Sequence, residues 1–441
     1  MYRKIEKTLA AWKDESVRKP LLITGARQTG KTYIVKDFGS RFFDSTIFID
    51  FEKRPQMKTV FDGDLDPSSI LSQLEVLSGV RYVDGRTLVF FDEIQACPRA
   101  ITALKYFYDS GLDFHVIGAG SLLGVALKRD DFSFPVGKVR TERLYPLNFE
   151  EFLIALNKTA LMEKCRSAFF SSSPLPSAIH EELLSLYRTY LVTGGMPEAV
   201  EAYLKGGSFI ASQDVQAEIL SDYRADIAKH ADNSDKILAQ RAFDTIPVQL
   251  AKENRKFQYN LIRKGVTSAI FGKSLEWLCA AGLTLRCIKV TSPEIPLKAY
   301  EDISSFKLYL LDSGLLTEMA GLPKEVILNQ LGERFLGGLT ENYIASMLVS
   351  NNVPLYYWES SGQAEIDFLI QAGTNIIPVE VKASDHVRSR SLSVYRSRFN
   401  PVLSIRLSTR NFGFDNGVLS IPLYAVWLLN EENLILIINK G

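Results

Sequence analysis

The chain has 441 residues, of which 46% are hydrophobic and 23% are charged, a composition that excludes fibrous and disordered chains. Its 51 basic residues equal its 51 acidic residues, so no overall positive field attracts nucleic acid or anionic lipid. The four cysteines lie far apart, which excludes a disulfide framework and a zinc site built on C-x-x-C pairs. Because the N-terminus is not leader-like and no stretch of about 18 residues is uncharged and apolar, we expect a cytoplasmic protein without a membrane partner.

Residues 1–152 alternate short apolar runs with segments of helical apolar spacing, which is typical of an α/β fold with a parallel sheet. Runs dense in Leu, Ile, Val and Phe predict strands buried on both faces at 21–24, 46–51, 87–91 and 114–118. Helical spacing predicts helices within 33–38, 68–77 and 101–108.

The remaining chain divides by pattern into three further parts. Helical spacing at 161–201, with a Ser- and Pro-rich loop at 171–176, predicts a helical lid over 153–214. Further helices and two β-rich runs around Pro293 and Pro296 predict a winged-helix-like module over 215–325. A helix from 333 and strands at 355–358, 365–370, 376–381 and 402–407 predict a separate α/β domain over 326–441.

A phosphate-binding loop is the strongest chemical signal, because residues 25–32 read G-x-x-x-x-G-K-T between a predicted strand and a predicted helix. Glycines let backbone N–H groups turn toward phosphate oxygens, and the following helix adds its positive end. Lys31 is expected to neutralise the β- and γ-phosphates of ATP, and the Thr32 hydroxyl to bind Mg²⁺. A chance match is the alternative, but the flanking strand and helix argue against it. The expected ATP-binding residues are Gly25, Ala26, Arg27, Gln28, Thr29, Gly30, Lys31 and Thr32.

An acidic strand end complements this loop. The apolar residues 88–91 run into Asp92 and Glu93, as a Walker B strand does. Asp92 is expected to hold Mg²⁺ and Glu93 to polarise the attacking water, although many strands simply end in an acid at the surface. Ser121 ends the next strand, where its hydroxyl can sense the γ-phosphate or can be ordinary turn chemistry.

These motifs together resemble an AAA-type family of bacterial and archaeal ATPases whose members carry a C-terminal domain of unknown function. The resemblance rests on residues 25–32, 91–95, 118–121, 144–152, 194–200, 306–309 and 312–316. It implies an additional-strand ATPase sheet of the ASCE class, Ser121 as sensor 1, and Pro197 in a lid turn near adenine. Similar chains often carry Gly-Arg where this one has Gly137-Lys138, so Arg140 and Arg143 are substitutes for an arginine finger or are solvated surface arginines.

A second candidate metal site lies near the C-terminus. Asp367 is followed after twelve residues by Glu380-Val381-Lys382, and strand alternation puts Glu380 and Lys382 on one face. Two carboxylates and a lysine can hold Mg²⁺ and orient a water for phosphodiester hydrolysis, with Glu341 as a further ligand. The spacing resembles the restriction-endonuclease-like PD-(D/E)xK superfamily. A surface charge pair, or a nuclease-like fold that no longer cleaves, is the alternative.

A locally basic stretch follows this site, with Lys382 and six arginines against the single acid Asp385. With interleaved Tyr395 and Phe399 it suits a phosphate backbone, or it is a solvated helix face. We therefore expect an ATPase that couples its nucleotide state to a nuclease-like domain on DNA, with self-association as a further candidate. The rival is a slow ATP-dependent switch whose C-terminal domain only holds DNA or a protein. The arginines are Arg388, Arg390, Arg396, Arg398, Arg406 and Arg410.

Overall fold

The chain divides into two compact units in a computed structural model that describes residues 1–121, 123–126, 134–230, 236–252, 255–261, 268–331, 333–360, 364–383 and 390–440. The first unit comprises Met1–Tyr145 with Ala280–Gly282, and the second comprises Pro146–Cys279 with Leu283–Gly441. No helix within these described residues is both long and apolar enough to cross a bilayer.

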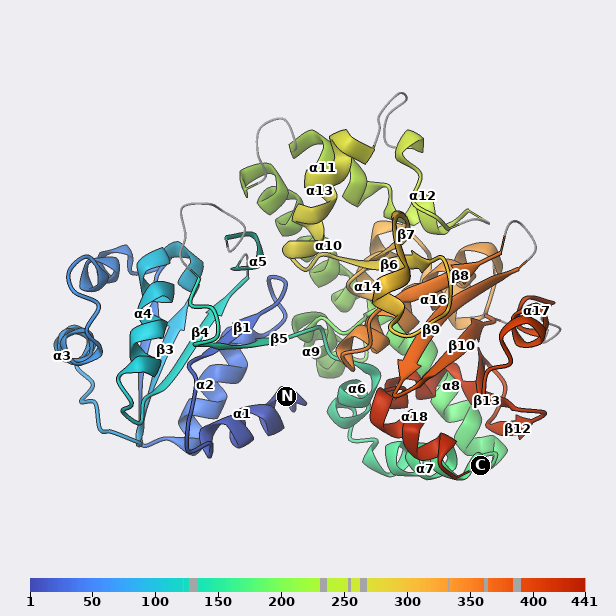
Figure 1. Cartoon of the computed structure of the whole chain (residues 1–441), viewed down its shortest axis with the longest axis horizontal. Helices are drawn as coiled ribbons and strands as arrows, with labels where there is room; N and C mark the ends of the chain where they lie inside the picture. The colour runs from blue at the N-terminus through green and yellow to red at the C-terminus, as the bar shows by residue number, and fades with distance from the viewer. Residues whose placement is uncertain are drawn as a thin grey trace. The chain divides into compact units, whose positions relative to one another are not determined.

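The first unit is built around a parallel sheet (Figure 1). Its elements are α1 (Ile5–Lys13), β1 (Leu21–Thr24), α2 (Lys31–Phe42), β2 (Ser45–Asp50), η1 (Pro55–Phe61), α3 (Pro67–Ser78), β3 (Thr87–Asp92), η2 (Ile94–Ala96), α4 (Pro98–Asp109), β4 (His115–Gly120), α5 (Leu123–Ala126) and β5 (Arg140–Arg143). Within the described residues the strand order is β2-β3-β4-β1-β5, and every neighbouring pair is parallel. The carboxyl ends of all five strands therefore meet at one edge of the sheet.

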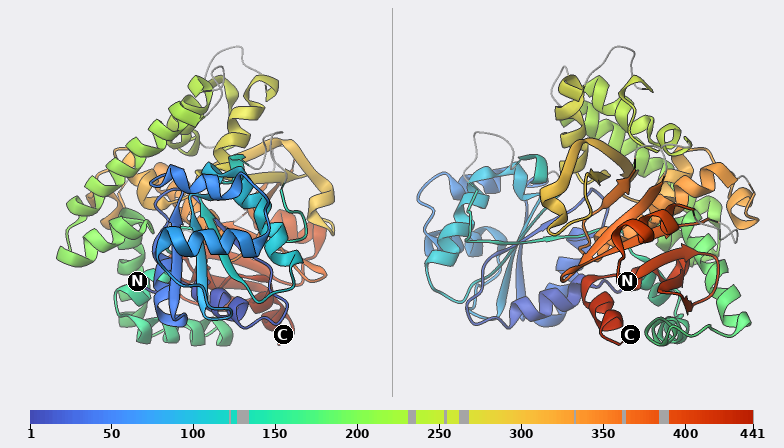
Figure 2. Two further views of the ribbon diagram at one scale, coloured as in Figure 1. Left: turned by 90° about the vertical axis from the view of Figure 1, so that its left-hand side faces the viewer. Right: turned by 45° about the vertical axis from the view of Figure 1, so that its right-hand side comes forward.

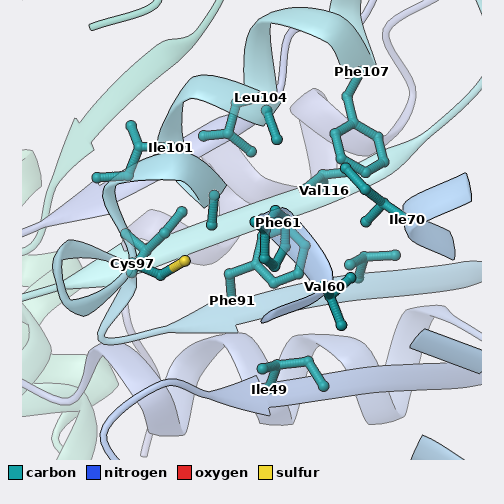
Figure 3. Close-up of a cluster of buried hydrophobic side chains, with 14 of the residues drawn as sticks. Ile49, Val60, Phe61, Ile70, Phe91, Cys97, Ile101, Leu104, Phe107 and Val116 are labelled. Carbon is teal, nitrogen blue, oxygen red and sulfur yellow. The ribbon is translucent and has the colours of Figure 1, made fainter. Parts of the chain in front are cut away.

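Helices cover both faces of this sheet and bury its apolar side chains. On one face η1, α3 and α4 pack against the strands, and Figure 3 shows Phe61, Leu104 and Phe107 gathered over Phe91 and Val116. On the other face α1 and α2 contribute Trp12 and Phe38 to a second core. Burial on both faces explains why strands β1 to β4 are almost entirely apolar in sequence.

The predicted strands of this unit end within two residues of the observed ones, and each predicted helix falls inside an observed helix, α2, α3 or α4. The strand order also agrees with the sheet that the family resemblance implies, because β4 lies between β1 and β3. Strand β5 was not predicted. Its residues are Arg, Thr, Glu and Arg at the edge of the sheet, where only alternate side chains are half-buried, so no apolar run marks it.

The second unit combines helices with a large mixed sheet (Figure 1, Figure 2). Its first elements are α6 (Phe149–Ala155), α7 (Thr159–Ser171), α8 (Ser177–Thr193), α9 (Pro197–Gly206), α10 (Phe209–His230), α11 (Lys236–Asp244), α12 (Ile246–Leu250), η3 (Tyr259–Leu261), α13 (Ser268–Ala280), β6 (Thr284–Val290), η4 (Leu297–Tyr300), β7 (Glu301–Leu310), α14 (Ser313–Met319) and α15 (Lys324–Leu328). They are followed by α16 (Glu333–Ser350), β8 (Tyr356–Glu359), β9 (Glu365–Ala372), β10 (Asn375–Val381), α17 (Arg390–Phe399), β11 (Ser404–Ser408), β12 (Gly413–Asp415), β13 (Val418–Pro422), η5 (Leu423–Leu428) and α18 (Glu431–Ile438).

The sheet of this unit corrects the predicted winged-helix module. The two predicted strands exist as β6 and β7, but β6 also pairs with β8 in parallel, and the described strands form one sheet in the order β12-β13-β11-β10-β9-β8-β6-β7. A hairpin that forms the edge of a larger sheet cannot project as a wing. The expected boundary at 325/326 therefore runs through one continuous sheet, because strand pairing between segments far apart in sequence leaves no local signal.

The segment at 144–152 contains the capped start of helix α6. Asn148 caps α6, and Glu151 completes a capping box by accepting from the backbone of Asn148. The backbone N–H of Leu147 donates to the carbonyl of Gly195 at 2.7 Å. These bonds tie residues from Pro146 onward to the second unit, so the first unit ends at Tyr145, whereas the expected boundary was 152/153.

The lid motif at 194–200 docks on the segment that begins at Asp312. The buried carboxylate of Asp312 accepts hydrogen bonds from the backbone of Gly195 at 2.6 Å and of Leu315 at 2.9 Å. A Cβ at Gly195 would lie 2.0 Å from the carbonyl oxygen of Leu147. Two motifs that the sequence shows as separate are therefore two sides of one packed contact.

Replacement of Gly195 by alanine is expected to destabilise the second unit by about 3 kcal/mol, because the backbone of Leu147 must move to admit the methyl group. Urea unfolding followed by circular dichroism measures the change. The matched control is Gly206→Ala, where a Cβ meets nothing within 4 Å and no loss of stability is expected. Equal stability of the two variants would contradict the close approach at Gly195.

Candidate functional site

The loop between β1 and α2 has the backbone that its glycines predict. Gly25 has a φ of 146°, and a Cβ there would lie 2.3 Å from the carbonyl oxygen of Leu144. Gly30 has a φ of 91° and precedes the first turn of α2, whose N–H groups lack intrahelical partners. A non-glycine residue at either position would be strained. The loop is therefore shaped to present backbone donors to an anion.

Arg3 fixes this loop from the N-terminal segment and was not predicted. Its guanidinium is buried and donates to the carbonyl of Thr29 at 2.8 Å and to the carbonyl of Tyr145 at 2.5 Å. An arginine three residues from the start of a chain carries no local signal of such a role. Arg3 thus connects the phosphate-binding loop to the last residue of the first unit.

Lys31 lies inside the loop, with its ammonium donating to the carbonyls of Gly25 at 3.1 Å and Ala26 at 2.7 Å. Burial lowers the pKa of Lys31 to about 8, and the nearby carboxylates of Glu93 and Asp92 oppose this shift. Because burial makes the charged form of Lys31 unfavourable, an anion that enters the loop would stabilise that charged form.

Thr32 and Asp92 meet where a metal ion is expected. From the first turn of α2, the Thr32 hydroxyl donates to Oδ2 of Asp92, the last residue of β3, at 2.8 Å. Burial raises the pKa of Asp92 to about 6, against the hydrogen bond from Thr32 that lowers it. A hydroxyl and a carboxylate are the hard oxygen donors that Mg²⁺ prefers, so the residues present fit this ion.

Glu93 is held beside them by two side chains. Its Oε2 accepts from Nε2 of Gln95 at 2.6 Å and from the hydroxyl of Ser121 at 3.3 Å. Glu93 has a φ of 47°, an uncommon conformation for a side chain other than Asn or Asp. The strand ends of β3 and β4 therefore orient one carboxylate at the edge of the sheet that carries the phosphate-binding loop.

The candidate arginine-finger positions are engaged within the first unit. Lys138 pairs with Asp109 at 2.7 Å. Arg140 pairs with Glu15 and Glu142, both at 2.8 Å. The guanidinium of Arg143 lies 5.3 Å from the ring centre of Tyr145. A finger role for any of them stays a prediction, as does the placement of Pro197 near adenine.

The two shifted pKa values predict a bell-shaped pH dependence for the binding of ATP with Mg²⁺. Phosphates favour the charged form of Lys31, so the association constant is expected to fall as pH rises above about 8. Metal binding requires the deprotonated carboxylate of Asp92, so it is expected to fall also as pH drops below about 6. Calorimetric titrations between pH 5 and 9 measure both limbs.

The acid limb needs a control, because the terminal phosphate of ATP has its own pKa near 6. The Asp92→Asn variant keeps the phosphate titration and removes the carboxylate, so the difference between variant and wild type isolates Asp92. A basic limb that is absent in the wild type would contradict the shifted pKa of Lys31.

In the second unit the structure brings Glu380 and Lys382 together, as strand alternation predicts. Nζ of Lys382 lies 3.0 Å from Oε1 of Glu380, whose side chain is buried. Asp367 on the neighbouring strand β9 accepts from the backbone N–H of Val381 at 2.8 Å. The order helix, strand, strand, strand from α16 to β10 matches the order expected from the sequence, and the predicted strand at 402–407 is present as β11.

Glu341 is directed elsewhere, toward a buried lysine that was not predicted. The ammonium of Lys307 on β7 lies 3.4 Å from Oε2 of Glu341, 2.5 Å from Oε1 of Glu365 and 3.9 Å from Oδ1 of Asp367. Arg255 pairs with the other oxygen of Glu341. Across the described residues, no group of three His, Cys, Asp or Glu side chains is arranged to hold a metal ion.

The predicted set of Glu341, Asp367, Glu380 and Lys382 is therefore not gathered around one point, because Lys307 draws Glu341 and Asp367 toward its own charge. The sequence offers one signal. Lys307 interrupts an apolar strand, and a lysine with 1% of its side chain exposed requires carboxylate partners.

The aromatic side chains within the basic stretch are less available to nucleic acid than the sequence predicts. Tyr395 is buried, and both Tyr395 and Phe399 pack edge-on against Trp358. Arg390 and Arg398 of α17 are exposed, whereas Arg388 and Asp385 lie outside the described residues. The aromatic rings belong to the core of the second unit, so this face offers charge without a stacking platform.

Three family models match parts of the chain. Residues 17–153 match an AAA domain, residues 184–326 a domain of unknown function (DUF8612), and residues 336–426 a domain of unknown function (DUF4143). An uncharacterized protein of Methanocaldococcus jannaschii is 26% identical over 204 residues, which cover 46% of this chain and 39% of that protein. The alignment therefore spans less than half of that relative.

Among solved structures, the chain is similar to a Walker-type ATPase of Pyrococcus abyssi, with 16% sequence identity and a TM-score of 0.42. The alignment covers 72% of this chain and 95% of that chain. The ORC2 protein of Aeropyrum pernix is 12% identical in sequence with a TM-score of 0.36, and the alignment covers 75% of this chain and 95% of that chain. These TM-scores are too low to establish a common fold. The match to the AAA domain, the parallel sheet and the complete phosphate-binding loop agree, so residues 17–153 form a P-loop domain that is similar to AAA domains.

Proposed function

We propose that this chain binds ATP together with Mg²⁺ and hydrolyses it. The observation that carries the proposal is the hydrogen bond of 2.8 Å between Thr32 and Asp92, with Glu93 directly after Asp92 and held by Gln95 and Ser121. The metal-binding pair and an oriented carboxylate thus lie on one edge of the sheet, beside a loop that suits phosphate. This combination supports hydrolysis, since a carboxylate held at this edge is placed to take a proton from water.

Each residue has a role in this proposal. The loop N–H groups and Lys31 bind the phosphates, and Thr32 and Asp92 hold Mg²⁺, which when bound withdraws charge from the phosphate oxygens. Glu93 orients the attacking water and accepts its proton, while Ser121 senses the γ-phosphate. Because the Thr32 hydroxyl and the Asp92 carboxylate are already hydrogen-bonded to each other, they need little rearrangement to bind Mg²⁺ when ATP arrives.

The test compares wild type with Lys31→Ala for ATP binding and phosphate release, with and without Mg²⁺. Loss of binding in Lys31→Ala and loss of turnover without Mg²⁺ are expected. The matched control is Lys36→Ala, an exposed lysine of the same helix whose ammonium lies over the ring of Phe48. Magnesium-independent turnover, or turnover that survives in Lys31→Ala, would refute the proposal.

We further propose that nucleotide state controls a second unit that holds DNA without cutting it. Lys307 favours this over cleavage, because its ammonium lies 3.4 Å from Glu341, 2.5 Å from Glu365 and 3.9 Å from Asp367, where its positive charge would repel a second Mg²⁺. Arg3 supports the coupling: it holds the carbonyl of Thr29 in the phosphate-binding loop and that of Tyr145.

Two measurements test this second proposal. Plasmid DNA with Mg²⁺ or Mn²⁺, with and without ATP, is expected to stay intact in wild type and in Glu380→Ala alike. Fluorescent duplex DNA is expected to bind, with an affinity that falls as salt rises and that drops in Arg390→Ala/Arg398→Ala. Cleavage that disappears in Glu380→Ala would establish an active nuclease, and absence of DNA binding would leave a protein partner for this unit. Self-association stays a prediction.

A further inference from the structure

Gln95 has a place in the ATP site that neither the motifs nor the family match assigns. It lies in η2, the short helix that follows Asp92 and Glu93, and this turn is closed by the backbone bonds Ala96 to Glu93 and Cys97 to Ile94, both 2.9 Å. The side chain of Gln95 therefore starts from a rigid position, one turn beyond the proposed base.

The two ends of its amide are used differently. Nε2 donates to Oε2 of Glu93 at 2.6 Å. Oε1 is buried and, among the described residues, accepts no hydrogen bond. The carboxylate fixes this orientation, because a flipped amide would set its oxygen against Oε2 of Glu93. Within the part of the chain that the structure describes, the one hydrogen bond that this amide makes is therefore the bond to Glu93.

The neighbouring strand β4 makes room for this arrangement. A Cβ at Gly120 would lie 2.1 Å from Oε1 of Gln95, and one at Gly118 would lie 2.8 Å from the side chain of Ile94. The hydroxyl of Ser121, the next residue, reaches the same oxygen of Glu93 as Gln95 does, at 3.3 Å. The small residues at 118–120 thus admit the turn that carries Gln95.

We propose that Gln95 is a positioning residue for hydrolysis, because its amide N–H group sets the direction of the Glu93 carboxylate toward the attacking water. The water oxygen bonds to the γ-phosphorus, the bond from that phosphorus to the bridging oxygen breaks, and its electron pair leaves with ADP. Glu93 receives the proton. This inference rests on the proposed ATP hydrolysis.

The test separates positioning from folding by comparing kcat, KM and ATP affinity. Gln95→Met keeps the length of the side chain and removes both polar ends, and it is expected to lower kcat by about 10- to 100-fold. KM and the dissociation constant of ATP should change less than about twofold, since the phosphate-binding loop is untouched. The matched control is Gln73→Met on the exposed face of α3, which should behave as wild type. An unchanged kcat in Gln95→Met, or equal losses of kcat and of ATP binding, would overturn the proposal.

A second variant decides the matter if Gln95→Met does not fold. Gln95→Glu is nearly isosteric and puts a carboxylate beside that of Glu93, so the pair should share a proton. The acid limb of the pH profile for kcat is therefore expected to move to higher pH, and an unmoved limb would refute contact between residues 93 and 95. Glu93→Gln is measured in parallel. If the wild type does not hydrolyse ATP, the proposed function itself fails. If the wild type is active and Glu93→Gln hydrolyses ATP normally, another group accepts the proton and only this inference fails; the same holds if Glu93→Gln is inactive while both Gln95 variants match wild type.

Discussion

Replacement of Glu93 by glutamine is expected to lower the rate of ATP hydrolysis by about 10²- to 10⁴-fold, the usual contribution of a general base. The amide is nearly isosteric but cannot take a proton from water. ATP binding should persist, because the loop at 25–32 and the Thr32 and Asp92 pair are unchanged. Phosphate release under single-turnover conditions measures the chemical step, and a fluorescent ATP analogue measures binding.

The matched control for this variant is Glu15→Gln. Glu15 is a partly exposed carboxylate of the same unit that pairs with Arg140 and lies away from the strand ends, so wild-type turnover is expected. Retained turnover in Glu93→Gln would show that another group accepts the proton. Loss of ATP binding together with turnover would show that Glu93 has a structural role instead.

Replacement of Lys307 by methionine is expected to destabilise the second unit by about 3 to 5 kcal/mol near neutral pH, the usual cost of removing one partner from a buried ion pair. Three carboxylates, from Glu341, Glu365 and Asp367, lose the ammonium that they share. Methionine fills similar volume, so the loss reports charge more than packing. Urea unfolding of the full chain, followed by tryptophan fluorescence, measures the difference from wild type.

Lys289→Met is the matched control, since Lys289 lies 3.6 Å from Glu359 and is partly exposed. Adding Glu365→Gln to Lys307→Met should recover part of the loss, and no recovery would contradict a shared charge cluster.

Local sequence predicted most of the first unit, because its signals act over a few residues. Apolar runs such as 87–91 must be strands buried on both faces, and Gly25 and Gly30 permit a loop that other residues would strain. The same rules located the strands of the second unit, including Glu365–Ala372 and Asn375–Val381. Strand β5 escaped prediction because an edge strand of alternating charged residues has no apolar run.

The organisation of the second unit could not be predicted in the same way. The strands 284–290 and 301–310 read correctly as a hairpin, yet β6 also pairs with β8, more than sixty residues further along the chain, and no local pattern encodes that pairing. The sequence predicted four parts, whereas contacts in the structure divide the chain into two compact units. Long-range strand pairing is decided by which faces can be buried together, which is a property of the whole fold.

By itself the sequence determined the chemistry at the carboxyl edge of the first sheet: the phosphate-binding loop, Asp92 and Glu93 each follow a strand, and parallel strands bring their ends together. Only the tertiary structure decided which side chains orient these groups, among them Arg3 and Gln95, and which cation the acidic residues of the second unit meet. The physical reason is that charge and hydrogen bonding act through space. Glu341 and Asp367 fit a metal site by their spacing in sequence. In the fold, the ammonium of Lys307 reaches both carboxylates from strand β7, and no local pattern predicts this contact.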